Sequence, residues 1–337
     1  MRNGLTGALL AAGALAWQGV AGAAAAAPDV VVSIKPVHAL VAAVMEGVGT
    51  PQLLIEGAGS PHSYSLKPSQ AAAIEDADVV FWIGPQLETF LQRPLATLGR
   101  EARTVALIES EGLTRLGFRS GSTFEAHAHD DDDHDHAHGE DDGHGHDHAA
   151  DAARADDDAH GHDDGLDPHV WLDPANAAAM TERIAAVLGA VDPDNAARYR
   201  DNAAAAGARL AALTAEVTAM LEPVRGRGFV VFHDGYRYFE ERFGVTAAGA
   251  LTVNPEVAPG AERVAEIREA VRRLDAVCVF AEPQFEPRLV AVVSEGTGAR
   301  SAVLDPLGAD LDDGPELYFA LIRGMATAMR DCLAEAG

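Results

Sequence analysis

Residues 29–48, DVVVSIKPVHALVAAVMEGV, pass from an apolar strand near Val30 to Ile34 directly into a helix that opens at Pro36. The strand is apolar at successive positions, which is typical of a strand buried on both faces. Similar apolar runs follow, with helix-forming segments between them, at residues 51–57 (PQLLIEG), 77–84 (ADVVFWIG) and 102–110 (ARTVALIES). This alternation predicts an α/β fold with a mainly parallel sheet that is covered by helices.

The same alternation restarts in the second half of the chain, with strands expected near residues 228–233, 246–253, 276–283 and 299–304. Before it lies a segment of thirty-odd residues with no interior proline and one glycine, Gly207, which predicts a helix about 45 Å long. We therefore expect two α/β lobes, residues 28–192 and 223–337, joined by a linking helix over residues 193–222.

Residues 1–27 have the features of a secretory signal peptide. Arg2 precedes an apolar stretch from about Leu5 to Val20, and small residues offer cleavage sites between about Ala23 and Ala27. A short membrane anchor or a buried helix is the alternative, but the apolar stretch is short and rich in Ala and Gly. We expect an exported, soluble mature protein in which no other segment spans a bilayer.

The formal charge of −27 is concentrated in one place. Residues 121–165 contain sixteen Asp or Glu and a single basic residue, Arg154, which leaves −12 for the rest of the chain. The folded parts have no basic patch or sustained polybasic run. This excludes the usual electrostatic signature of a nucleic-acid or membrane-surface protein.

The acidic stretch also holds ten of the fourteen histidines. A 45-residue insert whose only large hydrophobic residue is Phe124 cannot form a packed core, so we expect a disordered loop. Imidazoles at alternate positions suit weak, multiple chelation, which would make the loop an accessory metal collector or sensor. The alternative is that its charge merely keeps it solvated. The ten residues are His127, His129, His134, His136, His138, His144, His146, His148, His160 and His162.

The chain has two cysteines, Cys278 and Cys332. In an oxidising compartment such a matched pair is most simply a disulfide, and two buried free thiols are the alternative. The two residues are too far apart in sequence to match any zinc-binding spacing.

Three histidines stand apart from the acidic stretch. His62 follows the strand signal LLIEG, His169 lies in LDPHVWLDP, and His233 ends the apolar run GFVVFH. A single histidine in such a place is more often structural, but three at strand or helix boundaries in an exported protein predict a metal site with imidazole ligands. We interpret His38, at a helix start, as structural or exposed.

Several segments carry a family resemblance, in order along nearly the whole mature chain. They resemble the periplasmic zinc-binding proteins of high-affinity zinc ABC transporters, which belong to the metal-binding cluster of solute-binding proteins. The segments are SPHSYSLKPSQ (60–70), ADVVFWIGPQLE (77–88), DPHVWLDP (167–174), FHDGYRYFEERFG (232–244), NPEVAPGAERV (254–264), CVFAEPQF (278–285) and LDPLG (304–308).

The resemblance implies that His62, His169 and His233 hold zinc in a cleft between two lobes joined by a long rigid helix. It also implies a disulfide between Cys278 and Cys332, a His/Asp-rich loop that gathers metal, and a monomer that delivers zinc to a membrane permease.

The fourth ligand is open, because Pro61 occupies the place where some members of this family have an acidic residue. Water, a histidine of the loop, or Asp305 could take it. Manganese- and iron-binding relatives use a carboxylate at the position that Asp305 would match; alternatively, Asp305 is a turn or capping residue before Pro306. We expect hydrogen-bond acceptors next to the ligands to orient the histidine rings, and Asp234 and Glu282 are candidates for this role; the alternative is that both are surface or strand-end groups.

Three neutral imidazoles and one exchangeable place suit Zn²⁺, although Cu²⁺ would also bind them tightly. We therefore expect a periplasmic protein that captures Zn²⁺ for uptake and is not an enzyme. The alternatives are a manganese- or iron-binding relative, a zinc buffer, and a zinc hydrolase with a metal-bound water as nucleophile. Against the hydrolase, the sequence has no HExxH pair and no glutamate placed as an obvious general base.

Overall fold

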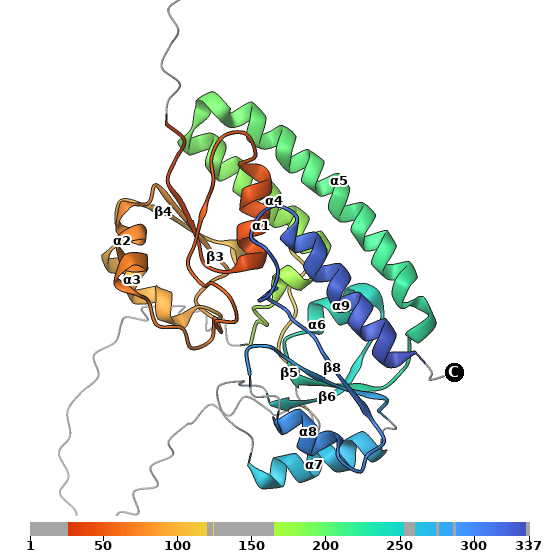
Figure 1. Cartoon of the computed structure of the whole chain (residues 1–337). Helices are drawn as coiled ribbons and strands as arrows, with labels where there is room; N and C mark the ends of the chain where they lie inside the picture. Colours follow the sequence, from red (N-terminus) through yellow and green to blue (C-terminus); the bar gives the residue numbers. More distant parts are fainter. Residues whose placement is uncertain are drawn as a thin grey trace, which may run out of the picture.

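The computed structural model describes residues 26–119, 124, 165–252, 260–273, 276–285 and 288–334. Nearly all of the expected signal peptide and all ten histidines of the acidic stretch lie outside the described residues, so those predictions are not tested here. Two four-stranded sheets organise the described part of the chain, and every strand pair in both is parallel. The predicted α/β class is confirmed (Figure 1).

The first sheet has the strand order β2-β1-β3-β4. Its strands are β1 (Val30–Val32), β2 (Gln52–Leu53), β3 (Val79–Trp82) and β4 (Arg103–Ala106). The helices of this lobe are α1 (Lys35–Val44), α2 (Pro68–Asp76) and α3 (Gln92–Thr97), with 3-10 helices at η1 (Thr89–Leu91), η2 (Leu107–Glu109) and η3 (Val170–Leu172). β1 and β3 are buried along their whole length, as continuous apolar runs predict.

The second sheet has the order β6-β5-β7-β8. Its strands are β5 (Phe229–His233), β6 (Ala247–Thr252), β7 (Cys278–Ala281) and β8 (Arg300–Val303). The accompanying helices are α6 (Arg237–Phe243), α7 (Ala261–Arg273), α8 (Arg288–Ser294) and α9 (Leu317–Leu333).

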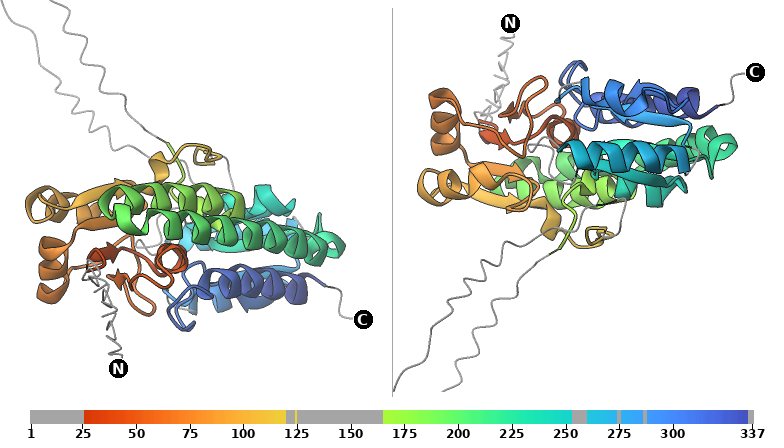
Figure 2. Two further views of the ribbon diagram at one scale, coloured as in Figure 1. Left: turned by 90° about the horizontal axis from the view of Figure 1, so that it is seen from above. Right: turned by 90° about the horizontal axis from the view of Figure 1, so that it is seen from below.

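One long helix, α5 (Ala196–Leu221), connects the lobes, and α4 (Pro174–Val191) packs against it. They lie side by side, and α5 runs past the first lobe to the far end of the second, where it contacts α9 (Figures 1 and 2). The α-helix is shorter than the predicted segment because 3-10 turns, η4 (Pro193–Asn195) and η5 (Glu222–Val224), flank it at the two prolines. The lobe boundaries at residues 192 and 222 remain a prediction.

By length and composition alone, Pro193–Val224 could cross a membrane. Its packing is that of a connecting helix, because the Tyr199, Leu210 and Leu213 side chains are fully buried in the core that both lobes share. On its exposed face, ion pairs between Arg209 and Glu316 and between Glu216 and Arg323 join it to the α9 region.

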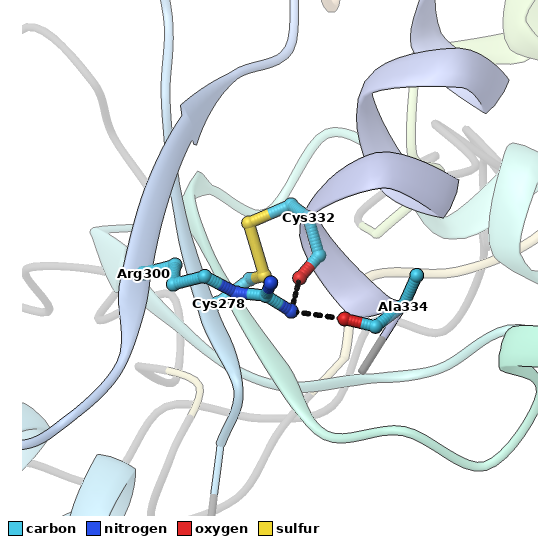
Figure 3. Close-up of a disulfide and its surroundings, with 4 residues drawn as sticks. All are labelled: Cys278, Arg300, Cys332 and Ala334. Carbon is cyan, nitrogen blue, oxygen red and sulfur yellow. Dashed lines mark hydrogen bonds between the residues drawn. A yellow bond between two sulfur atoms is a disulfide. The ribbon is translucent and has the colours of Figure 1, made fainter. Parts of the chain in front are cut away.

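A disulfide joins β7 to the last turn of α9, with 6.1 Å between the Cα atoms of Cys278 and Cys332 (Figure 3). Arg300 on the neighbouring β8 donates hydrogen bonds to the carbonyl oxygens of Cys332 and Ala334, which have no partner within the helix at its C-terminus. The predicted pairing is confirmed, and it closes a loop with a sequence separation of 54 residues.

Glu88 fixes the carboxyl ends of β1 and β3 from inside the first lobe. It is fully buried, and its carboxylate accepts hydrogen bonds from Ser33 Oγ at 2.5 Å, the Ile83 amide at 3.1 Å and the Gly84 amide at 2.9 Å. Burial outweighs these hydrogen bonds and raises the pKa of Glu88 to about 7.

This pKa predicts a pH dependence of stability. A carboxyl whose pKa is raised on folding favours the folded state fully below its unfolded pKa, and this contribution is lost as the pH rises through about 7. The rise in the pKa of Glu88 from 4.5 to about 7 corresponds to roughly 3 kcal/mol of folding stability. In urea unfolding of the metal-free protein, the free energy of unfolding should therefore fall more steeply from pH 4.5 to 7.5 in the wild type than in Glu88→Gln. Parallel curves would contradict the assignment.

Candidate metal centre

The three histidines singled out in the sequence meet between the two sheets. His233 is the last residue of β5, His62 lies in the loop between β2 and α2, and His169 immediately precedes η3. Because β5 and β2 belong to different sheets, the cluster is built from the carboxyl ends of strands in both lobes, where open α/β sheets place their ligand sites.

One ligand atom from each ring lies within 4.8 Å of the others, and no further group of this kind is found in the described part of the chain. The Nε2 atoms of His169 and His233 are 3.1 Å apart. Two nitrogens on a tetrahedral zinc ion with bonds of about 2.0–2.1 Å are separated by roughly 3.3 Å, so this pair is close to the spacing that zinc requires. His169 and His233 are buried, and His62 is half-buried.

A buried carboxylate orients each of the two buried rings. His169 Nδ1 lies 2.8 Å from Asp167 Oδ1, and His233 Nδ1 lies 2.6 Å from Glu282 Oε1. If each Nδ1 carries the proton and donates it to its carboxylate, both Nε2 lone pairs face each other across the cluster. A cation between them stabilises this arrangement.

The electrostatics of the rings differ. Burial, with the nearby His169 and His233, lowers the pKa of His62 well below its usual value, which keeps that ring neutral. Burial acts in the same direction on His233, but the charge and hydrogen bond of Glu282 outweigh it and raise the pKa of His233. Neutral imidazoles are the ligand form, so the proton and a metal ion compete for this ring.

The space at the cluster is small. A cavity of about 10 Å³ adjoins the three rings and is lined by residues of both lobes, including Pro61, Trp171, Phe285, Pro306 and Leu307. This volume is about that of one water-sized probe. The site therefore has room for one small species beside the imidazoles.

Asp305 lies outside this cluster. Its carboxylate accepts hydrogen bonds from the amides of Leu307, Gly308 and Ala309 at 2.6 to 3.0 Å, and from the Gln284 side chain at 3.1 Å. These contacts correspond to the turn role considered for Asp305 and not to a metal ligand.

The structure also places the supporting residues named from the sequence. His38 is buried, and its Nε2 lies 3.0 Å from the Pro51 carbonyl oxygen, a structural contact. Glu282 orients His233 as expected. The expectation for Asp234 was wrong, because its carboxylate accepts from Arg119 and not from a ligand ring. Sequence reasoning missed Asp167, although its place two residues before His169 is a common spacing for a local side-chain hydrogen bond.

Gly235 was also missed. A Cβ atom at this position would clash with Nε2 of His233 and would lie 3.0 Å from Nε2 of His169. The backbone after β5 therefore passes so close to both Nε2 atoms that a larger residue would displace one of the rings. The HDG order directly after an apolar strand was the available signal, since glycine at a strand end often marks a close approach of the backbone.

The fold and the cluster together define the class: a two-lobed α/β binding protein with a candidate metal site between its lobes. Residues 30–332 match the family model described as zinc-uptake complex component A, periplasmic. The chain belongs to this family.

Named relatives agree with this assignment, and a solved structure shares the fold. The chain is 58% identical over 306 residues to the "high-affinity zinc uptake system protein ZnuA" of Brucella suis, covering 91% of this chain and 92% of the relative. Identity to the protein of the same name from Paracoccus denitrificans is 45% over 312 residues, covering 92% and 93%. A crystal structure of ZnuA aligns with a TM-score of 0.71 at 23% identity, covering 91% of this chain and 100% of that one, which supports the fold.

We expect Gly235→Ala to disrupt the cluster while the protein still folds. The added methyl group must displace His233 or His169, so the zinc affinity measured by chelator competition should fall by about 10-fold or more. Gly207→Ala on α5, where an added Cβ meets nothing within 4 Å, is the matched control and should leave zinc affinity unchanged. Equal affinities for both variants would show that the close approach at Gly235 is not required.

Proposed function

We propose that this protein captures Zn²⁺ in the periplasm through His62, His169 and His233 and delivers it to the permease of an ABC transporter. The observation that carries the proposal is the convergence of three imidazole nitrogens within 4.8 Å at the junction of the lobes. The names of the relatives, which describe a high-affinity zinc uptake system, support the same role.

The donor set favours zinc over manganese or iron. In the described residues the cluster contains imidazoles only, and the nearest carboxylates, of Asp167 and Glu282, are hydrogen-bonded to the rings. Harder ions prefer more oxygen ligands. We propose water as the fourth ligand, because the Asp305 carboxylate is held by a turn and three imidazoles leave one place on a tetrahedral zinc ion.

A hydrolytic role is less well supported. A zinc hydrolase needs space for its substrate beside the metal and a free general base. Here the cavity measures about 10 Å³, and Asp167 and Glu282 each pair with a ring Nδ1 through one carboxylate oxygen. We therefore propose a binding protein and not an enzyme.

Export is supported by two features. The family is described as periplasmic, and the Cys278–Cys332 disulfide suits an oxidising compartment. The signal peptide over residues 1–27 and the docking of the permease are part of the same proposal. So is the accessory role of the ten histidines from His127 to His162.

The ligand assignment predicts the effect of removing each ring. His62→Ala, His169→Ala and His233→Ala should each weaken the tight zinc site by about 100-fold or more, since each loses one of three direct ligands. Calorimetry with a competing chelator measures this. His38→Ala is the control and should retain the wild-type affinity; a large loss in that variant, with none in one of the three, would show that the ligand set is wrong.

The accessory role predicts a separate result. Replacing residues 125–164 by a short Gly/Ser linker should remove several weak zinc equivalents and leave one tight equivalent, because the three proposed ligands lie outside that segment. Zinc titration followed by calorimetry measures both classes. Loss of the tight site on this replacement would place a ligand within the acidic stretch.

A further inference from the structure

The side chain of Arg119 lies between the lobes beside the metal centre. Its Nε donates to both carboxylate oxygens of Asp234 at 2.9 and 3.1 Å, and Nη1 and Nη2 donate to Glu240 at 2.7 and 3.0 Å. Nη2 also contacts Asp234 Oδ1. The Asp234 and Glu240 side chains are only 3% and 4% exposed, so one guanidinium pairs with two buried carboxylates.

This guanidinium connects the backbones that carry two of the proposed ligands. On one side, Asp234 directly follows His233 at the end of β5. On the other, the Phe118 amide donates to the Gly165 carbonyl at 2.8 Å, next to an antiparallel bridge between Gly117 and Leu166. The chain then runs through Asp167 to His169, so Arg119 joins the His169 segment in the first lobe to the His233 loop in the second.

Neighbouring contacts hold α6 to the same segment. The Tyr238 hydroxyl donates to the Asp167 carbonyl at 2.9 Å and accepts from the Leu116 amide at 3.0 Å, and Arg237 donates to the Gly117 carbonyl. Of these contacts between the lobes, only that of Arg119 reaches Asp234, whose amide also donates to the Thr252 carbonyl within the second lobe at 3.3 Å. Without Arg119, the Asp234 carboxylate would be left buried and unpaired beside the site, and Glu240 would keep only the hydrogen bond from the Ala247 amide at 2.9 Å. The loop would have to move to hydrate Asp234.

We propose that Arg119 is a positioning residue of the zinc site. By bridging Asp234 and Glu240 it holds His233 at its separation from His169, and thereby slows the release of zinc. The inference rests on the proposed zinc-binding function and adds a residue that controls how long the ion stays bound.

Because Arg119 is positively charged, an effect of its charge and an effect of its position would change the zinc affinity in opposite directions. A cation near Zn²⁺ repels it, so if Arg119 acted only through its field, removing it would tighten zinc binding. If it acts by positioning, removing it weakens binding, because the two imidazoles lose their fixed separation. Lysine keeps the charge but lacks the planar fork that pairs with two carboxylates, so Arg119→Lys separates the two effects.

Arg242 provides a matched control. It lies on α6, as Glu240 does, and also pairs across the lobes, donating to Asp173 at 2.6 and 2.7 Å, but Asp173 is not adjacent to a proposed ligand. Arg242→Ala therefore removes an interlobe ion pair without touching the loop that carries His233. Any effect that comes only from weaker contact between the lobes should appear in both variants.

The experiment compares the wild type, Arg119→Ala, Arg119→Lys and Arg242→Ala as full chains. Chelator competition gives the zinc Kd, stopped-flow chelation gives the dissociation rate, and urea unfolding of the metal-free proteins gives stability. We expect Arg119→Ala to raise the Kd about 10-fold or more, chiefly through faster dissociation, with Arg119→Lys weakened to a smaller degree. Arg242→Ala should lose stability but keep its Kd within about twofold of the wild type.

An unchanged or tighter zinc Kd in Arg119→Ala would overturn the inference, and so would the same weakening in Arg242→Ala. If Arg119→Ala does not fold, a wild-type rate of zinc dissociation in Arg119→Lys would overturn it. A wild type that lacks a tight zinc site would instead contradict the proposed function itself. The two failures are therefore distinguishable.

Discussion

Two imidazole nitrogens, Nε2 of His169 and Nε2 of His233, are held 3.1 Å apart by the meeting of two parallel sheets. Each ring is fixed by a buried carboxylate on its other nitrogen, and both rings point into the same small cavity. Such an arrangement would give the proposed metal site its geometry before an ion arrives. The two histidines come from different lobes, so this separation is kept only if the lobes are held in a fixed position.

The fold provides that rigidity in several ways. Helix α5 packs along both lobes, and one apolar core includes residues from both sheets. Trp171, two residues after His169, donates to the Pro306 carbonyl of the second lobe at 2.9 Å, and Tyr318 donates to the Trp171 carbonyl at 2.7 Å. The site is thus surrounded by direct hydrogen bonds between the lobes, which suits a protein that holds one ion of fixed coordination.

Much of this was predictable from the sequence, for identifiable reasons. Continuous apolar strands separated by helices predicted the parallel sheets, and the three histidines at element boundaries were the ones that the fold brings together. The supporting residues were harder to predict. Asp234 stands next to His233 but turns towards Arg119, whereas Asp167 and Gly235 act through side-chain direction and backbone proximity, which depend on tertiary structure. The role of Asp305 was left open because an Asp-Pro sequence is compatible both with a turn residue and with a metal ligand.

The most direct test of the central claim is zinc K-edge X-ray absorption of the mature protein loaded with one equivalent of zinc. The account predicts a four-coordinate ion with three imidazole nitrogens at about 2.0–2.1 Å and one further light ligand, with no sulfur. A six-coordinate, oxygen-rich spectrum, or one with fewer than three imidazoles, would contradict it.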